Sequence, residues 1–315
     1  MIRTEGLTRR FDDMVAVDGL DLEIATGEIF GFLGPNGAGK TTTVRMLAAL
    51  IAPSAGKAWI AGHQIGAGNQ EIRRAVGILT ETPGLYARLT AMENLRLFGR
   101  LHQLDHIDDT IERYLKMLDL WERRHEPVGG FSKGMRQKVA ITRALLHEPE
   151  VVFLDEPTSG LDPISARVVR DFVANLKDQG RTIFLCTHNL DEADRLCDRI
   201  GVFKRRLIRV DTPQALRQNL YGHTVRISLA HPPSPNHLLA LKGIDGVEKV
   251  EEADTDDGHT LRLSVGDPQT HNPAIITALV GAGAQIRFVE QEEASLEKVY
   301  MDLLGDDPPN TEAQP

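Results

Sequence analysis

Short apolar runs recur along the chain and predict the strands of a sheet that is covered on both faces. Runs of four or five mainly apolar residues are typical of buried parallel strands, whereas strict alternation indicates strands with one exposed face. The first pattern occurs at residues 29–33, 75–79, 151–154 and 182–186, and the second at Gly6–Thr8 and Leu20–Ile24. Together they predict an α/β fold for the N-terminal part of the chain.

Helices are predicted by the residues that cap them. Thr90–Glu93 is a capping-box sequence that opens an amphipathic helix. Ser132 is an N-cap type of residue ahead of a second helical stretch, and Asp162-Pro163 starts a third, which Gly180 ends. Residues 83–147 are therefore predicted to be a mostly helical insertion.

The pattern changes after about residue 220. Strands and helices alternate at 224–229, 237–242, 247–252, 260–265, 274–280 and 284–289, and a closing helix is predicted at 293–304. The order βαββαβ indicates a small α+β module of the ferredoxin-like kind. The predicted domains are residues 1–220, with a helical subdomain at about 83–147, and residues 221–305. The polar, proline-rich tail, residues 306–315, is predicted to be disordered.

Residues 34–41 (GPNGAGKT) form the G-x-x-x-x-G-K-T pattern of a phosphate-binding loop. The loop lies between the predicted strand 29–33 and a predicted helix at 41–50, which is the context that such a loop requires. Its glycines let the backbone fold around phosphates, and the amides at the helix start direct positive charge at the anion. An incidental glycine-rich turn is the weaker interpretation. The residues expected to hold a nucleoside triphosphate are Gly34, Pro35, Asn36, Gly37, Ala38, Gly39, Lys40, Thr41 and Thr42.

Within this loop Lys40 is expected to reach the β- and γ-phosphates and Thr41 to ligate Mg²⁺. Asp155 and Glu156 follow the apolar run 151–154, at the carboxyl end of a strand, where open α/β sheets bind ligands. Asp155 is a candidate Mg²⁺ ligand, and Glu156 is a candidate for polarising the attacking water. A helix-capping acid is the alternative interpretation.

His188 follows the strand 182–186, which should neighbour the strand that carries Asp155. The histidine could therefore donate a hydrogen bond to the γ-phosphate, although a polar loop residue is the commoner role for such a position. His102 and His106 have a spacing compatible with a metal, but exposed histidines at a helix end are favoured because no further ligand is in sight.

A second anion site is predicted at residues 131–137 (FSKGMRQ), where a helix start offers a hydroxyl, a positive side chain and unpaired amides. Two anion sites in one subunit, the phosphate loop and this helix start, are explained if two copies face each other and the helix start of each completes the phosphate site of the other. The segment resembles a relaxed form of the LSGGQ signature of ABC ATPases, and the resemblance covers about residues 1–220 with the motifs in the expected order. It implies a P-loop NTPase core of the ABC type that binds ATP and Mg²⁺.

The resemblance also implies roles for individual residues. Phe11 matches the aromatic residue that stacks on adenine, although spacing alone would favour a core aromatic there. Ser132 and Gly134 match signature residues that contact the ATP of the opposite subunit. Asp162 belongs to a segment, Ser159–Asp162, that is similar to the D-loop crossing the dimer interface, and His188 matches the switch histidine.

Two positions depart from the family pattern. Glu81 stands where a Gln is usual, near Mg²⁺ and the membrane partner, so it is predicted to be a third acid at the metal and to tighten divalent-ion binding. A solvated loop acid is the alternative. Lys133 stands where Gly is usual, and it could either add a cation near the γ-phosphate or lie on the surface.

The C-terminal module is similar to the extension of exporter ATPases of the daunorubicin-resistance and sodium-extrusion type. That resemblance implies an ATP-binding and ATP-hydrolysing subunit of an exporter that drives a separate integral-membrane permease by closing as a dimer on ATP. Its partner is expected to be a second ATPase subunit, and a second copy is favoured over a related chain. The resemblance also implies a cytoplasmic protein on the inner face of the membrane, with the helical region receiving the permease. Bracing the dimer is the expected role of the module, and ligand sensing is the alternative.

Composition agrees with this interpretation. The chain has 315 residues and a net charge of −9, which argues against a nucleic-acid surface as its main function. Two cysteines suggest no disulfide framework, and Cys186 is expected to be a small buried residue. The N-terminus lacks the apolar core of a signal peptide, and no apolar run approaches the length of a membrane span.

Two rival functions are less favoured. A soluble ABC ATPase acting in translation or DNA repair would be expected to carry two sets of motifs or a long heptad repeat, and this chain has neither. A regulatory module that binds ATP but hardly hydrolyses it is disfavoured by the presence of Glu156.

Overall fold

The computed structural model describes residues 1–80, 82–221, 223–255, 258–292 and 295–305. The chain divides into two compact units, residues 1–213 and 214–315. Each unit has its own sheet and is described by itself.

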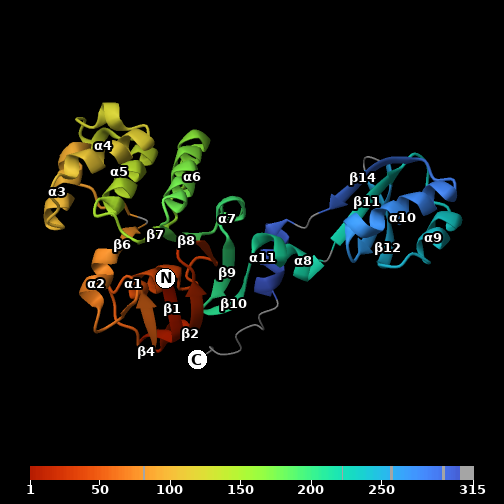
Figure 1. Cartoon of the computed structure of the whole chain (residues 1–315), viewed down its shortest axis with the longest axis horizontal. Coiled ribbons are helices and arrows are strands. Elements are labelled where there is room, and N and C mark those ends of the chain that lie inside the picture. Colours follow the sequence, from red (N-terminus) through yellow and green to blue (C-terminus); the bar gives the residue numbers. More distant parts are fainter. Residues whose placement is uncertain (81, 222, 256–257, 293–294, 306–315) are drawn as a thin grey trace, which may run out of the picture. The chain divides into compact units, whose positions relative to one another are not determined.

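The N-terminal unit is built on a six-stranded sheet (Figure 1). Its strand order is β10 (Arg206–Asp211), β9 (Arg199–Lys204), β3 (Ile29–Leu33), β8 (Thr182–Thr187), β7 (Val151–Asp155) and β6 (Val76–Leu79). All neighbours are parallel except β10 and β9. Every residue of β3, β7 and β8 is buried, which confirms that the apolar runs are strands covered on both faces.

The register of these strands brings the predicted acids and the histidine to one edge. Asp155 pairs with Cys186, so β7 and β8 end side by side, as predicted for the strands that precede Glu156 and His188. Cys186 is fully buried, as expected.

A second, antiparallel sheet has the order β2 (Met14–Ile24), β1 (Ile2–Phe11), β4 (Ala55–Ile60) and β5 (His63–Gln64). Its buried residues share one core with helix α1 (Lys40–Leu47) and with the six-stranded sheet. Val44, Met46 and Leu47 of α1 lie in this core. This packing fixes the position of α1, whose first residue, Lys40, belongs to the phosphate loop.

The helical region has a small core of its own. Helices α3 (Ala91–Leu101), α4 (Ile107–Met117) and α5 (Lys133–Leu145) gather on one side of the unit, after α2 (Asn69–Ala75) (Figure 1). Thr90 and Glu93 form the predicted capping box, and Ser132 caps α5 by accepting a hydrogen bond from the Met135 amide. His102 ends α3 and His106 precedes α4, and both are exposed.

Two further helices follow the strands of the sheet. Asp162 caps α6 (Pro163–Asp178), with Pro163 at its first position as predicted, and Asn189 caps α7 (Leu190–Leu196). In the part of the chain that the structure describes, none of the helices combines the length and apolarity of a membrane span.

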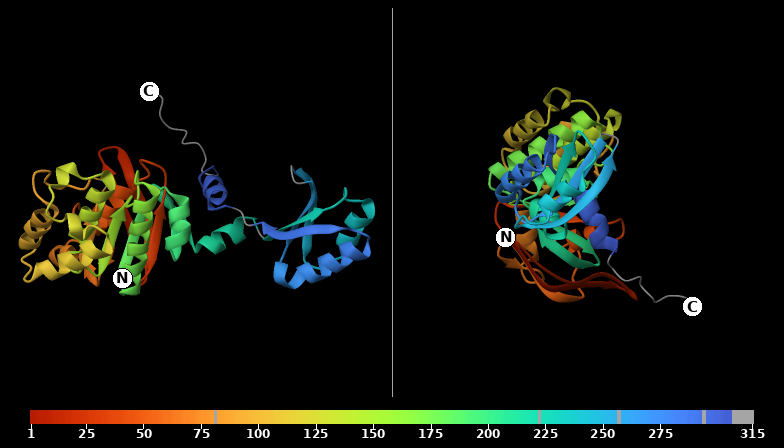
Figure 2. Two further views of the ribbon diagram at one scale, coloured as in Figure 1. Left: turned by 90° about the horizontal axis from the view of Figure 1, so that it is seen from above. Right: turned by 90° about the vertical axis from the view of Figure 1, so that its right-hand side faces the viewer.

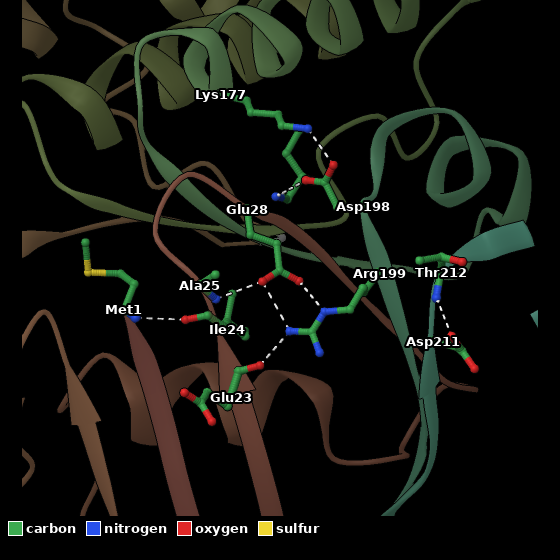
Figure 3. Close-up of polar contacts among 11 residues, drawn as sticks. Met1, Glu23, Ile24, Ala25, Glu28, Lys177, Asp198, Arg199, Asp211 and Thr212 are labelled. Atoms are coloured by element: carbon green, nitrogen blue, oxygen red, sulfur yellow. Dashed lines mark hydrogen bonds and ion pairs between the residues drawn. The ribbon is translucent and has the colours of Figure 1, made fainter. Parts of the chain in front are cut away.

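Polar contacts gather at the end of the unit where β3 and β9 begin, and a hydrogen bond from Arg199 to Glu23 joins the two sheets there (Figure 3). Arg199, the first residue of β9, donates from Nε to Oε1 of Glu28 at 2.8 Å and from Nη2 to the carbonyl oxygen of Glu23 at 2.7 Å. Asp198 accepts a hydrogen bond from the Ile29 amide at 2.9 Å and pairs with Lys177 of α6 at 2.5 Å. These contacts hold the start of β3, and hence the loop at its other end.

The C-terminal unit has the ferredoxin-like element order that the sequence predicts. The elements are α8 (Pro213–Tyr221), β11 (His223–Leu229), α9 (Pro235–Leu241), β12 (Val247–Thr255), β13 (Gly258–Val265), α10 (Pro268–Gly281), β14 (Ile286–Glu292) and α11 (Leu296–Gly305). The sheet order is β12-β13-β11-β14, antiparallel throughout. Helices α9 and α10 cover one face of it (Figure 2), and Val225, Ile227 and Leu263 form the core beneath them.

Candidate active site

A cavity of about 670 Å³ lies at the carboxyl ends of β3, β7 and β8. This is the edge at which open α/β sheets bind ligands, and the volume suits a nucleotide-sized molecule. The cavity is lined by Met14, Val15, Ala16, Pro35, Asn36, Gly37, Ala38, Gly39, Lys40, Thr41, Thr42, Asp155, Glu156, Ser159, His188 and Arg205.

The phosphate loop needs its glycines for two different reasons. A Cβ on Gly34 would collide with the carbonyl oxygen of Phe203 in β9, so this position lets the loop pass close to the sheet. Gly39 has φ +104° and a Cβ there would collide with the carbonyl oxygen of Ala16, so both conformation and space exclude a side chain. The loop is thus a bare backbone cradle at the start of α1, as an anion requires.

Lys40 is held inside this loop. Its residue is only 7 % exposed, and Nζ donates hydrogen bonds to the carbonyl oxygens of Gly34 at 2.5 Å and Pro35 at 3.2 Å. The ammonium group therefore lies within the cradle, where phosphate oxygens would be its natural partners.

Thr41 and Asp155 bring two hard oxygen donors together. The Thr41 hydroxyl donates to Oδ2 of Asp155 at 2.9 Å, and Asp155 is 6 % exposed. A hydroxyl and a carboxylate from different elements, meeting beside a phosphate cradle, are the donor set that suits Mg²⁺ held jointly by protein and phosphates. The residues present therefore fit this ion.

Glu156 and His188 share a hydrogen bond beside the cavity. Nδ1 of His188 lies 2.7 Å from Oε1 of Glu156, and the two side chains are 60 % and 15 % exposed respectively. Glu156 has φ +52°, an uncommon conformation for a residue other than glycine, and its amide donates to the carbonyl oxygen of Cys186 at 2.9 Å. Strained backbone of this kind tends to occur at functional sites and must be held by its surroundings.

Several residues that the sequence singled out lie outside the cavity lining. Phe11 is 39 % exposed and does not line the cavity; the guanidinium carbon of Arg9 lies 4.4 Å from the centre of its ring. Gly34 supports the loop from behind without lining the cavity. Glu81 lies outside the described residues, so its expected place at the metal stays a prediction.

Ser132, Gly134 and Asp162 lie together at the starts of α5 and α6, apart from the cavity lining. Gly134 faces Ser165, since a Cβ on it would approach the Ser165 hydroxyl oxygen to 3.0 Å. Hydrogen bonds from Ser165 hold the pKa of Asp162 below its usual value. The ammonium group of Lys133 lies against Gly160 of the same chain.

Sequence reasoning missed four of the lining residues. Met14, Val15 and Ala16 come from β2, and Arg205 comes from the turn after β9. Ser159, which was named only as part of the D-loop-like segment, also lines the cavity. Arg205 has φ +60°, and its backbone donates to Ala38 in the phosphate loop at 2.9 Å and accepts from Asp18 at 2.8 Å. The basic run at 204–206 is visible in the sequence, but only the pairing of β9 with β3 brings it to the loop.

Comparison with known families and proteins covers both units. The family described as "ABC transporter" matches residues 17–159, and the family described as "ATP-binding protein DrrA1-3-like, C-terminal domain" matches residues 212–304. The daunorubicin resistance ATP-binding protein DrrA3 of Streptomyces coeruleorubidus is 37 % identical over 313 residues, which cover 97 % of this chain and 96 % of that protein. A fluoroquinolones export ATP-binding protein of Mycobacterium tuberculosis is 34 % identical over 308 residues, covering 97 % and 93 %.

Solved structures match the larger part of the chain. An ATP-binding subunit of an ABC transporter gives a TM-score of 0.65 at 30 % identity, covering 70 % of this chain and 94 % of that chain. A dimeric ATP-binding cassette in a post-hydrolysis state, bound to ADP and Pi, gives a TM-score of 0.62 at 25 % identity, covering 67 % and 98 %.

Proposed function

The chain belongs to the ATP-binding proteins of ABC transporters, and we propose that it is the ATP-hydrolysing subunit of an exporter whose permease is a separate polypeptide. The observation that carries the proposal is one cavity at which the phosphate loop, the Thr41–Asp155 pair and the Glu156–His188 pair meet. The export direction is supported by relatives that are named for drug resistance or drug export and match both units of the chain.

Hydrolysis would be divided among these residues. Lys40 and the loop amides would hold the β- and γ-phosphates. Thr41 and Asp155 would hold Mg²⁺, which neutralises charge that develops on the phosphates. Glu156 would orient and polarise the attacking water, and His188, which already contacts Glu156, would donate to a γ-phosphate oxygen.

A second copy of the chain is proposed to complete each site. Ser132, Gly134 and Asp162 sit at two helix starts that the chain's own cavity does not use. A helix start attracts anions, and the two helix starts would be available to bind the ATP held by a facing subunit. That arrangement is supported by the similarity to a cassette solved as a dimer. Phe11 is proposed to stack on adenine after the Arg9 guanidinium moves from its ring.

Pairing and reopening of the two subunits would drive the permease, since a ligand that binds the closed state better shifts the population toward it. The protein would then act in the cytoplasm, on the inner face of the membrane, with the helical region against the permease. Glu81 is proposed as an additional acid at the metal, which the variant Glu81→Gln tests through the Mg²⁺ dependence of turnover.

The proposal is tested by a pull-down from detergent-solubilised membranes of the native cell, with Glu156→Gln to trap the ATP-bound state. Glu71→Gln, which removes an exposed acid on α2, outside the helical region proposed to face the permease, is the matched control. Co-purification of a protein with several membrane spans, together with ATPase activity of the wild-type chain, is the expected result. Recovery of ribosomes or nucleic-acid complexes instead would support a soluble ABC ATPase.

A further inference from the structure

Glu192 in α7 is a buried carboxylate close to the catalytic loops. The residue is 1 % exposed, and its Oε1 accepts a hydrogen bond from the Thr158 hydroxyl at 2.8 Å. Its Oε2 is enclosed and has no hydrogen-bond partner within the described chain. Among the described residues, only the hydroxyls of Thr158 and Thr187 stabilise the charge of this buried carboxylate by hydrogen bonding, and burial opposes them. Such a position costs stability, so it needs a physical reason.

The local sequence would ordinarily direct this side chain elsewhere. Asn189 and Glu192 have capping-box spacing, and the first half of the box forms, since the Glu192 amide donates to Oδ1 of Asn189 at 3.1 Å. The second half does not form, because the Asn189 amide donates to the Thr187 hydroxyl at 3.0 Å instead. In α3 the same spacing at Thr90 and Glu93 gives the complete, exposed box.

The diverted carboxylate joins the two segments that carry the proposed catalytic pair. Thr158 is two residues after Glu156, in the loop from β7 to α6, and Glu192 is four residues after His188. The hydrogen bond between Glu192 and Thr158 is therefore a third link between these segments. The other two are the hydrogen bond of His188 with Glu156 and that of the Glu156 amide with Cys186.

We propose that Glu192 is a positioning residue for ATP hydrolysis, which holds the Thr158 hydroxyl and so fixes the strained Glu156 relative to His188. Glu156 adopts φ +52° and needs such support. The hydrogen bond from its amide to the Cys186 carbonyl oxygen holds its backbone only on the N-terminal side. The loop from Glu156 to Asp162 also leads to the cap of α6, so the same hydrogen bond would fix the segment proposed to face the second subunit. The inference rests on the function proposed above and deepens it.

Steady-state ATPase assays on the full-length chain test the role. Glu192→Ala removes the acceptor and is expected to lower kcat about tenfold while changing KM for ATP less than about twofold. Thr158→Val removes the donor from the other side and should have the same effect. The double variant should be no slower than either single variant, because both remove one interaction. Glu192→Gln keeps an acceptor oxygen and should retain most of the wild-type kcat.

The outcomes separate the inference from the proposed function. Wild-type turnover together with an unchanged kcat in Glu192→Ala and Thr158→Val would overturn the inference alone. So would a loss in Glu192→Gln as large as that in Glu192→Ala, or losses that add in the double variant. A wild-type chain that neither binds nor hydrolyses ATP would overturn both. If Glu192→Ala does not fold, as judged by thermal unfolding, Thr158→Val compared with the conservative Thr158→Ser decides.

Discussion

Nδ1 of His188 lies 2.7 Å from Oε1 of Glu156, so the residues that follow two adjacent parallel strands share a hydrogen bond beside the nucleotide cavity. The parallel pairing of β7 with β8 makes this contact possible, because it sets Asp155 opposite Cys186. The carboxylate and the imidazole therefore lie beside the same small volume, and the hydrogen bond holds each relative to the other.

Replacing either member of this pair should abolish most of the turnover. Glu156→Gln removes the proposed water-polarising carboxylate and should lower kcat by at least about 10²-fold, the usual range for a general base. ATP binding should persist, because the phosphate loop is untouched. Single-turnover ATPase assays alongside equilibrium ATP titration measure the two effects. Turnover of Glu156→Gln within a few-fold of the wild-type rate would exclude Glu156 as the base.

His188→Ala provides the companion measurement. We expect a similar loss, and a double variant that is little worse than either single one, because the two residues act on one step. Fully additive losses would mean that the hydrogen bond in the structure has no part in hydrolysis.

Much of this site could be predicted from the sequence, because its residues follow short apolar runs. Asp155 ends a strand, the phosphate loop, Glu156 and His188 each follow one, and parallel strands bring their carboxyl ends to one edge. The ferredoxin-like element order of the C-terminal unit was also predictable, because the hydrophobic periodicity of each segment distinguishes strands from helices.

The remaining features depend on tertiary pairing that no local pattern encodes. Arg205 reaches the cavity only because β9 pairs with β3. The Glu192 side chain does not complete its capping box because the Asn189 amide donates to the Thr187 hydroxyl instead. Helix α1 ends at Leu47, short of the predicted residue 50, and Ala49 follows with φ +54°. The helix propensity of residues 48–50 is thus overridden by the turn that leads to β4.

Thr41→Ala should weaken the apparent affinity for Mg²⁺. The change deletes the hydroxyl that lies 2.9 Å from Oδ2 of Asp155 and leaves the carboxylate as the only donor of this pair. We expect the Mg²⁺ concentration for half-maximal ATPase activity to rise about tenfold, and Thr41→Ser to restore it. A half-maximal concentration that is equal in the alanine variant and the wild type would exclude Thr41 as a ligand.

Arg205→Ala should weaken nucleotide binding without a comparable loss in maximal rate. The residue lines the cavity, and its backbone is fixed to Ala38 in the phosphate loop, so its cation should attract the polyphosphate. We expect the Kd for ATP, measured by titration, to rise about three- to tenfold, corresponding to about 0.7–1.4 kcal/mol. Arg206→Ala is the matched control, because Arg206 is paired with Asp18 and does not line the cavity. Equal effects of the two variants on the Kd would mean that Arg205 acts only through the net charge of the protein and not through its place at the cavity.

The stacked pair of His147 and His102 should make stability fall as the solution becomes acidic. The two rings lie 4.5 Å apart at 7°, Nε2 of His147 lies 2.9 Å from the Val76 carbonyl oxygen, and Nδ1 of His147 is buried without a hydrogen-bond partner among the described residues. Burial is the largest cause that lowers the pKa of His147. The residue His102 is exposed, but the loss of solvent around its stacked ring lowers its pKa as well. Arg181 and the neighbouring ring act in the same direction on His147, while Glu148 and the Val76 carbonyl oppose them.

A histidine whose pKa is lower in the folded than in the unfolded state binds fewer protons when folded. Its stabilising contribution is therefore complete above the unfolded pKa of about 6.5 and is lost as pH falls below that value toward the folded pKa. We expect the Tm of the wild-type chain to drop more steeply between pH 7 and pH 5 than that of His147→Gln, in which the titrating ring is absent. His106→Gln, at an exposed position before α4, should follow the wild-type curve. Parallel curves for the wild type and His147→Gln would mean that the buried ring is protonated as readily in the folded chain as in the unfolded one.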